Sequence, residues 1–123
     1  MRDMDLTREQ WEWRRPVHRE DDGELLGFVV PRAGDWIPTA VFGSALDAPV
    51  QLREAVTLLE RLGLEPLADP WLLQRDGEEP LQVRILEAGP EHVTVRNDDY
   101  GSGLDLDARW TLPAPAGDLR RHR

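Results

Sequence analysis

The chain has 123 residues and a formal net charge of −9, and leucine, isoleucine, valine and phenylalanine make up a quarter of it, which suits one folded domain and excludes intrinsic disorder. It contains no cysteine and no lysine, which excludes disulfides, thiol catalysis, thiolate zinc sites, Schiff-base chemistry and a phosphate-binding-loop lysine. No apolar run approaches the roughly 20 residues that span a bilayer, and residues 1–115 hold 12 arginines and 23 acidic residues, which disfavours contact with nucleic acid or a membrane.

The N-terminal segment predicts a cytoplasmic protein that begins with an edge strand. Asp3 and Asp5 stand where an export signal carries positive charge, so we expect no secretion. Trp11 and Trp13 are two residues apart, like side chains on one face of a strand, and this pattern predicts a strand over residues 11–19. The two tryptophans either close the core of their own chain or form an aromatic patch that contacts a partner.

A hairpin and a third strand follow. Asp22 and Gly23 form a two-residue turn signal, after which residues 25–30 have the apolar character of a strand. Residues 37–42 form the next predicted strand. Within it Pro38 lacks an amide donor, which favours a position at the edge of a sheet.

Residues 48–62 have the pattern of an amphipathic helix. Apolar residues recur every three or four positions and form one face, with charged residues on the other. Asp47 is the predicted N-cap, and Pro49 lies in the first turn, where its missing amide donor is not needed. Gly63 suits the left-handed position that ends a helix. The apolar face comprises Leu52, Ala55, Val56, Leu59 and Leu62.

The second half of the chain predicts four more strands, at residues 71–75, 81–85, 92–96 and 104–112. The last three alternate apolar and polar residues, and such alternation means that one face is buried, as in antiparallel sheets. The order of elements therefore predicts an α+β fold. We expect a curved, mainly antiparallel sheet, or a partly open β-barrel, of six to seven strands with one packed helix at about residues 48–62.

The C-terminal end predicts a flexible tail. A stretch rich in proline, alanine and glycine precedes it, so we place a single α+β domain at residues 1–113 and a flexible tail at residues 114–123. The tail carries four basic residues, which is typical of a solvated terminus, and we expect no nucleic-acid partner. Those residues are Arg120, Arg121, His122 and Arg123.

The segment 97–105 is rich in oxygen-bearing side chains and holds the single tyrosine and the single asparagine of the chain. Its spacing fails the EF-hand pattern, and its Gly-x-Gly-x-Asp fragment occurs once, whereas calcium-binding β-rolls repeat it. A solvated hairpin loop is the favoured interpretation, and we predict no metal site and no cofactor. Asp98, Asp99 and Tyr100 remain a candidate contact patch for a ligand or partner.

Histidines and serines are the remaining candidates for catalysis. His18 and His92 fall on polar strand faces, and no spacing around them matches a metal site. Ser102 is not part of a Gly-x-Ser-x-Gly nucleophile turn. We therefore predict no catalytic residue.

The favoured hypothesis is a small, non-catalytic cytoplasmic module for protein–protein interaction or regulation. It contacts another protein or a second copy of itself through a sheet edge or through the strand that holds Trp11 and Trp13. In a homodimer formed by this strand, Glu12 of one chain faces Arg14 of the other across a two-fold axis.

The second hypothesis is a small-ligand-binding protein or an acid–base enzyme. Its pocket would lie at the mouth of the curved sheet, with Asp98, Asp99 and Tyr100 on the rim. A deep cavity with a desolvated carboxylate favours this hypothesis, whereas a filled core with exposed apolar side chains favours the first.

Overall fold

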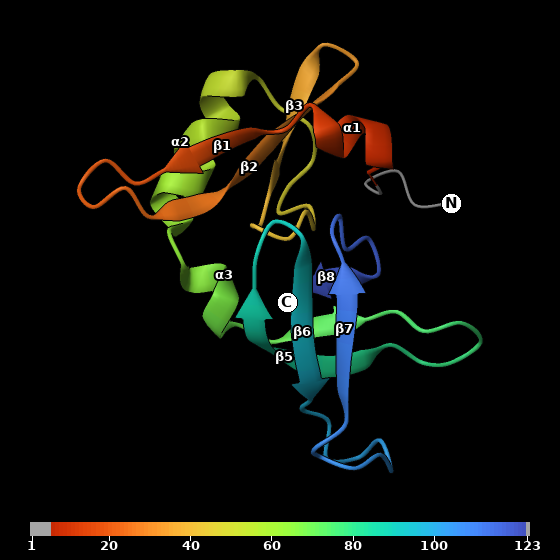
Figure 1. Cartoon of the computed structure of the whole chain (residues 1–123). Coiled ribbons are helices and arrows are strands. Elements are labelled where there is room, and N and C mark those ends of the chain that lie inside the picture. Colours follow the sequence, from red (N-terminus) through yellow and green to blue (C-terminus); the bar gives the residue numbers. More distant parts are fainter. Residues whose placement is uncertain (1–5, 123) are drawn as a thin grey trace.

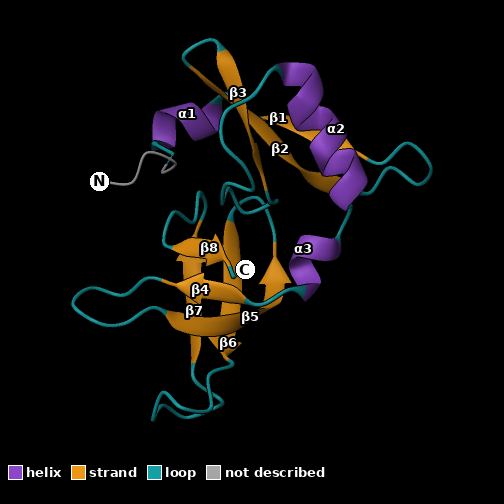
Figure 2. Cartoon of the chain, turned by 180° about the vertical axis from the view of Figure 1, so that it is seen from behind, coloured by secondary structure: helices purple, strands orange, loops and turns teal. Residues whose placement is uncertain are grey.

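The computed structural model describes residues 6–122 as two antiparallel sheets, stacked one above the other in Figure 1. In chain order the elements are α1 (Arg8–Glu12), β1 (Arg15–His18), β2 (Leu25–Arg32), β3 (Asp35–Thr39), α2 (Leu52–Leu62), α3 (Glu65–Ala68), β4 (Trp71–Leu73), β5 (Leu81–Ala88), β6 (His92–Asn97), β7 (Arg109–Pro113) and β8 (Leu119–Arg121). The strand order is β1-β2-β3 in the N-terminal sheet and β7-β6-β5-β4-β8 in the C-terminal sheet. Helix α2 lies beside the N-terminal sheet, and α3 connects it to the C-terminal one (Figure 2).

The predicted α+β fold with antiparallel pairing is confirmed, but the strands do not close into a barrel. Strand β3 forms one edge of the N-terminal sheet, where the loop residues Ala45 and Val50 pair with it. The strands form two sheets rather than the one sheet expected, and the number of strands in residues 6–122 is eight because β8 adds to those predicted.

The N-terminal sheet is buried on both faces of its central strand, β2. Residues 26–30 are all buried. Phe28 and Val30 pack with Trp11 and Ala114 on one side. On the other side Gly27 approaches α2 so closely that a Cβ built on it would lie 3.2 Å from Leu59 Cδ2 and 2.2 Å from the Thr39 carbonyl oxygen.

Helix α2 confirms the predicted amphipathic pattern. Ala55 and Leu59 are buried, and the other members of the predicted apolar face pack against the core. The helix begins later than predicted, with Gln51 rather than Asp47 at the N-cap. The reason is that Val50 exchanges two backbone hydrogen bonds with Trp36, at 2.8 and 2.9 Å, which hold the chain extended up to the start of the helix.

The core of the C-terminal sheet is filled with side chains. Trp71, Val83, Val93 and Val95 are fully buried, and the Trp71 indole N–H donates to the Pro66 carbonyl oxygen at 2.8 Å. Trp71 also meets Phe42 from the linker after β3, with ring centroids 5.2 Å apart. The two sheets therefore share one continuous core.

The prediction of a strand over residues 11–19 is wrong at its start, since Trp11 lies in α1 and Trp13 is the C-cap of that helix. Thr7 caps α1, because its hydroxyl accepts from the Gln10 N–H at 3.0 Å and the Gln10 side chain accepts from the Thr7 N–H at 2.9 Å. Strand pairing begins only at Arg15. Residues 1–5, which carried the expectation about export, lie outside the described residues.

Two predictions near the C-terminus are also wrong. Residues 104–108 are not a strand, and β7 begins at Arg109. Over residues 114–122 the chain is not a free tail: β8 pairs with β4, Leu119 is buried, and Arg121 forms an ion pair with Asp69. Burial of Ala114 and Ala116 fixes the approach to β8.

Candidate functional site

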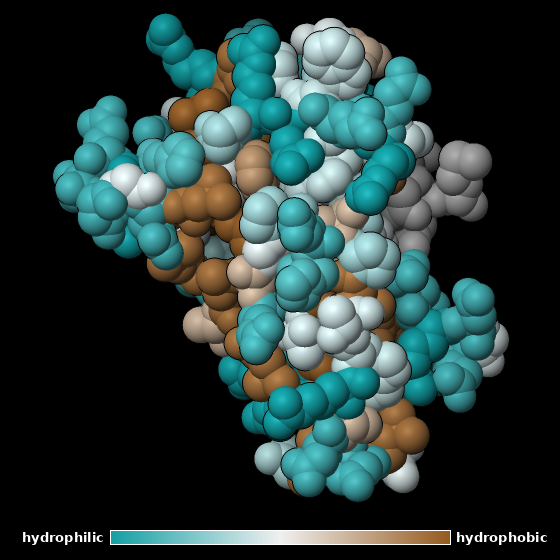
Figure 3. All heavy atoms as spheres, in the orientation of Figure 1, coloured by the Kyte–Doolittle hydropathy of each residue, from teal (hydrophilic) through white to brown (hydrophobic). Residues whose placement is uncertain are grey.

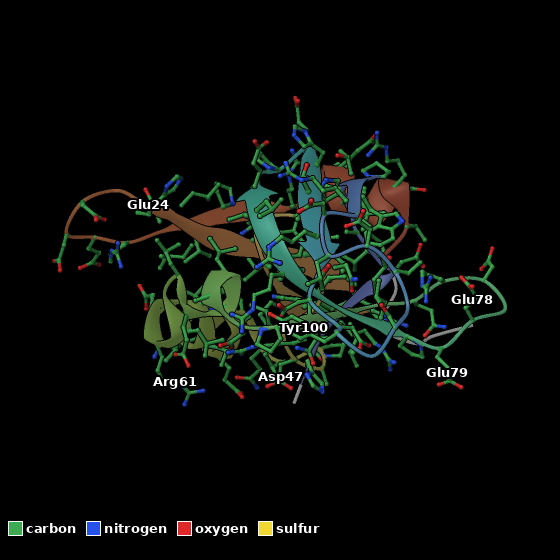
Figure 4. All side chains as sticks on the ribbon, turned by 90° about the horizontal axis from the view of Figure 1, so that it is seen from below. Glu24, Asp47, Arg61, Glu78, Glu79 and Tyr100 are labelled. Carbon is green, nitrogen blue, oxygen red and sulfur yellow. The ribbon has the colours of Figure 1, made fainter. Side chains whose placement is uncertain are left out.

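The connection between β6 and β7 brings together three of the five predicted site residues. We call residues 98–108 the tyrosine loop. It contains Asp98, Asp99 and Tyr100 and lies at the lower end of the molecule in Figure 1. Tyr100 is labelled in the view from below in Figure 4.

Asn97, the last residue of β6, organises the tyrosine loop from its base. Its side chain is fully buried. The amide nitrogen donates to the carbonyl oxygens of Leu104 and Asp105, at 3.2 and 3.1 Å. The amide oxygen accepts from the backbone N–H of Asp99 at 2.9 Å. One buried side chain therefore ties both arms of the loop together.

Short-range hydrogen bonds order the rest of the tyrosine loop. The carboxylate of Asp99 accepts from the Gly101 N–H at 3.0 Å. The Ser102 hydroxyl donates to the Asp99 carbonyl oxygen at 2.9 Å and accepts from the Leu104 N–H at 3.1 Å. Gly103 has a φ of +80°, a backbone angle that residues with a side chain rarely adopt. Hydrogen bonds thus fix the loop on both sides of Tyr100.

The tyrosine loop exposes its largest apolar side chains. Tyr100 is 83% exposed, and Leu104 and Leu106 are 39% and 41% exposed. A brown hydrophobic side chain lies among teal hydrophilic ones at this end of the molecule in Figure 3. Apolar groups that face water on an ordered loop mark a surface suited to contact with another molecule.

Asp98 fixes the loop to β5. Its carboxylate accepts from Arg84 Nε at 2.9 Å and from Gln82 Nε2 at 3.2 Å. Partial burial acts to raise the pKa of Asp98, but the hydrogen bonds from Arg84 and Gln82 together outweigh it and hold the pKa below its ordinary value. Asp98 therefore acts as an ionised anchor near neutral pH.

The other two predicted site residues lie at the opposite end of the molecule, at α1 (Figure 1). Trp11 is 2% exposed and packs edge-on against Phe28, with ring centroids 5.1 Å apart. Trp13 is 68% exposed. Trp11 is therefore part of the core, whereas Trp13 lies on the surface at the end of the fold opposite the tyrosine loop (Figure 1).

Other features offer less to a ligand. A depression of about 210 Å³ lies between α2 and the segment before it, and Figure 4 labels two residues of its wall, Asp47 and Arg61. His18 Nδ1 is 3.0 Å from the Gly23 carbonyl oxygen within the β1–β2 turn, and His92 is exposed at the start of β6.

Within residues 6–122, no three His, Asp or Glu side chains are arranged to hold a metal ion. No helix in the same residues combines the length and apolarity needed to cross a membrane.

Asn97, Leu104 and Leu106 belong to the site but were not predicted as parts of it. The two leucines alternate with aspartates, which led to a strand prediction. The sequence feature that indicates a loop here is the cluster of Asn, Asp, Ser and Gly around the two leucines, since these residues favour turns and most of their side chains hydrogen-bond to nearby backbone.

Comparisons of the chain with protein-family models, curated proteins and solved structures find no match.

Proposed function

We propose that this chain is a small, non-catalytic protein-interaction module that docks a partner protein through the tyrosine loop. The observation that carries the proposal is the 83% exposure of Tyr100 on a loop whose base is fixed by the fully buried Asn97. Tyrosine gives a large contact area with few rotatable bonds, and an ordered backbone reduces the entropy lost on binding.

The charge of the loop supports a partner with an apolar pocket and a basic rim. Residues 98–108 contain four aspartates and no basic residue. Exposed aromatic and aliphatic side chains surrounded by charge match the usual arrangement of an anchor and a polar rim at protein interfaces. A cytoplasmic location and the lack of a nucleic-acid partner remain predictions from the sequence.

The alternative of a ligand pocket or an acid–base site has less support. The depression beside α2 has none of the predicted rim residues Asp98, Asp99 and Tyr100 in its wall, and its volume of about 210 Å³ is below the roughly 300–1,000 Å³ of typical ligand sites. The lowered pKa of Asp98 also moves it away from neutrality, where general acids and bases work best.

Site-specific photo-crosslinking tests the proposal. A photo-reactive phenylalanine replaces Tyr100 in the chain produced in its own cells, and a matched variant carries it at Glu78, at the tip of the β4–β5 loop (Figure 4). We expect a covalent adduct of defined mass from position 100 and none from position 78. Adding Asn97→Ala should reduce the adduct, because the loop then loses its order. Equal labelling from both positions, or no adduct from position 100, would overturn the proposal.

A further inference from the structure

We propose that the partner of the tyrosine loop is a second copy of this chain, bound head to tail through the opposite end of the molecule. This opposite surface comprises Trp13 and Arg14, and we call it the tryptophan end. The inference rests on the proposed function, because it names what the same loop binds.

The tryptophan end presents an exposed ring and one positioned cation. Trp13 is 68% exposed. The guanidinium carbon of Arg14 lies 4.5 Å from the centroid of the Trp11 ring and 5.2 Å from that of the Phe28 ring. Stacking fixes the plane of this guanidinium and leaves N–H groups at its edge. Arg14 uses one donor on the Trp11 carbonyl oxygen, at 3.0 Å, and it forms no ion pair within residues 6–122. Arg15 stacks over Trp36 on the opposite face of the N-terminal sheet and is not part of this surface.

The tyrosine loop offers the complementary groups. Asp99 and Asp105 each use one carboxylate oxygen for a hydrogen bond inside the loop. Among the described residues, neither they nor Asp107 forms an ion pair. A guanidinium edge binds a carboxylate with two parallel hydrogen bonds. Tyr100 and Trp13 then supply the apolar contact, since aromatic residues are the usual anchors of interfaces.

The chain segments that hold the two surfaces also have net charges of opposite sign. Residues 98–108 carry four aspartates without a basic residue, whereas residues 6–16 carry three arginines against Glu9 and Glu12. Opposite local charges steer two surfaces together. The net charge of −9 on each chain opposes contact at long range, and the Debye length of about 8 Å at physiological salt limits this repulsion.

The position of the two surfaces requires that the contact join different chains. The tryptophan end and the tyrosine loop lie at opposite ends of the fold (Figure 1), so they do not meet within one molecule. A contact between two unlike surfaces leaves one of each free, and such contacts produce open chains or closed rings. The two-fold dimer predicted from the sequence required a strand that holds Glu12 and Arg14, whereas Glu12 lies in α1 and strand pairing begins at Arg15.

Mixing two exposed-residue variants of the purified chain tests the head-to-tail contact. The variants are Trp13→Ser, which keeps the tyrosine loop, and Tyr100→Ser, which keeps the tryptophan end. In sedimentation equilibrium, we expect the average mass of the unmodified chain to rise above the 14.1 kDa of the monomer as the concentration increases to about 1 mM. Each variant alone should stay at 14.1 kDa, and an equimolar mixture should form a pair of twice that mass. Glu78→Ser, at an exposed site outside both surfaces, should associate like the unmodified chain.

The outcomes separate this inference from the proposed function. An unmodified chain that stays at 14.1 kDa at every concentration overturns the self-contact. So does association that persists in either variant, or a mixture that fails to pair. If the chain is monomeric but position 100 crosslinks to a different protein, the docking function stands and the second copy is the wrong partner. A monomeric chain without any crosslink at position 100 overturns both.

Discussion

The buried amide of Asn97 lies 3.2 Å from the carbonyl oxygen of Leu104, seven residues along the chain, and this hydrogen bond closes the base of the tyrosine loop. Loops with few such bonds lose conformational freedom only when a partner binds. Here folding has already fixed the backbone on both sides of Tyr100, so less entropy is lost on docking. The hydrogen bonds of Asn97 therefore make the tyrosine loop an ordered docking surface rather than a flexible connection.

Replacement of Asn97 by alanine should release the loop and destabilise the fold. The change removes the side-chain partner of Asp99, Leu104 and Asp105 from a fully buried position. Loss of buried hydrogen-bond partners costs about 1–3 kcal/mol. Urea denaturation measures this loss, and faster hydrogen exchange at the Asp99 amide measures the release.

Ser102→Ala is the control for this change, because it removes shorter-range bonds within the loop and leaves Asn97 in place. It should reduce stability by less than Asn97→Ala. An Asn97→Ala chain with unchanged stability and exchange would show that another interaction fixes the loop.

Trp11 and Trp13 should respond oppositely to truncation. Trp11→Ala removes a ring that is 2% exposed, and we expect a loss of about 3–5 kcal/mol in the free energy of unfolding. Trp13→Ala removes a ring that is 68% exposed, and the loss should stay within about 0.5 kcal/mol. Chemical denaturation compares them directly. Similar losses from both would contradict the assignment of Trp11 to the core and Trp13 to the surface.

Much of the fold follows from periodic patterns in the sequence. The recurrence of Ala55 and Leu59 at four residues predicts α2, and alternation around Val83, Val93 and Val95 predicts β5 and β6. Each of these elements buries one face, and the regular spacing of its apolar residues in the sequence shows which face it is. The pairing of β8 with β4 is not recorded in this way, because three residues are too few for a pattern and the partner lies far along the chain.

The misassigned segments show where period alone misleads. Trp11 and Trp13 imitate strand spacing, yet Thr7 and Gln10 form a capping box whose sequence signature precedes them. Leu104 and Leu106 alternate with acids but remain exposed, because the hydrogen bonds of Asn97 fix the backbone in another conformation. Local hydrogen bonds determine the backbone conformation of both segments. The spacing of two tryptophans or two leucines does not indicate these hydrogen bonds.

The Asp98–Arg84 pair should make stability depend on acidity. The pKa of Asp98 is lowered in the folded chain, compared with about 3.9 when unfolded. The stabilisation is therefore present above pH 4 or so and disappears as the pH falls through the folded-state pKa. Carbon-13 NMR of the Asp98 carboxyl should show the lowered pKa, and Arg84→Gln should raise it.

A matched arginine variant provides the control for this titration. Arg53 lies on the exposed side of α2 and forms no ion pair within residues 6–122, so Arg53→Gln should leave the pKa of Asp98 unchanged. If Arg84→Gln also leaves it unchanged, the Arg84 contact is not the cause of the shift.

Gly27 should tolerate no side chain. A Cβ at this position would lie 2.2 Å from the Thr39 carbonyl oxygen, so β2 and β3 would have to move apart. We expect Gly27→Ala to cost at least about 1–3 kcal/mol. Gly89→Ala is the matched control, since its nearest neighbour would lie 3.9 Å away, and its effect should stay within about 0.5 kcal/mol. Equal thermal stability of the two variants would contradict the close packing of β2 against β3.

The most direct test of the tyrosine loop as a preformed docking surface is the nitrogen-15 NMR order parameter of its backbone. The purified chain should be measured at low concentration, with the β4–β5 loop around Gly77 as an internal comparison. We predict values near 0.85 for the amides of residues 99–106, equal to those of β6. Values below about 0.6 would mean that the loop is flexible before binding. They would contradict the claim that the hydrogen bonds of Asn97 order the backbone around Tyr100 before a partner binds.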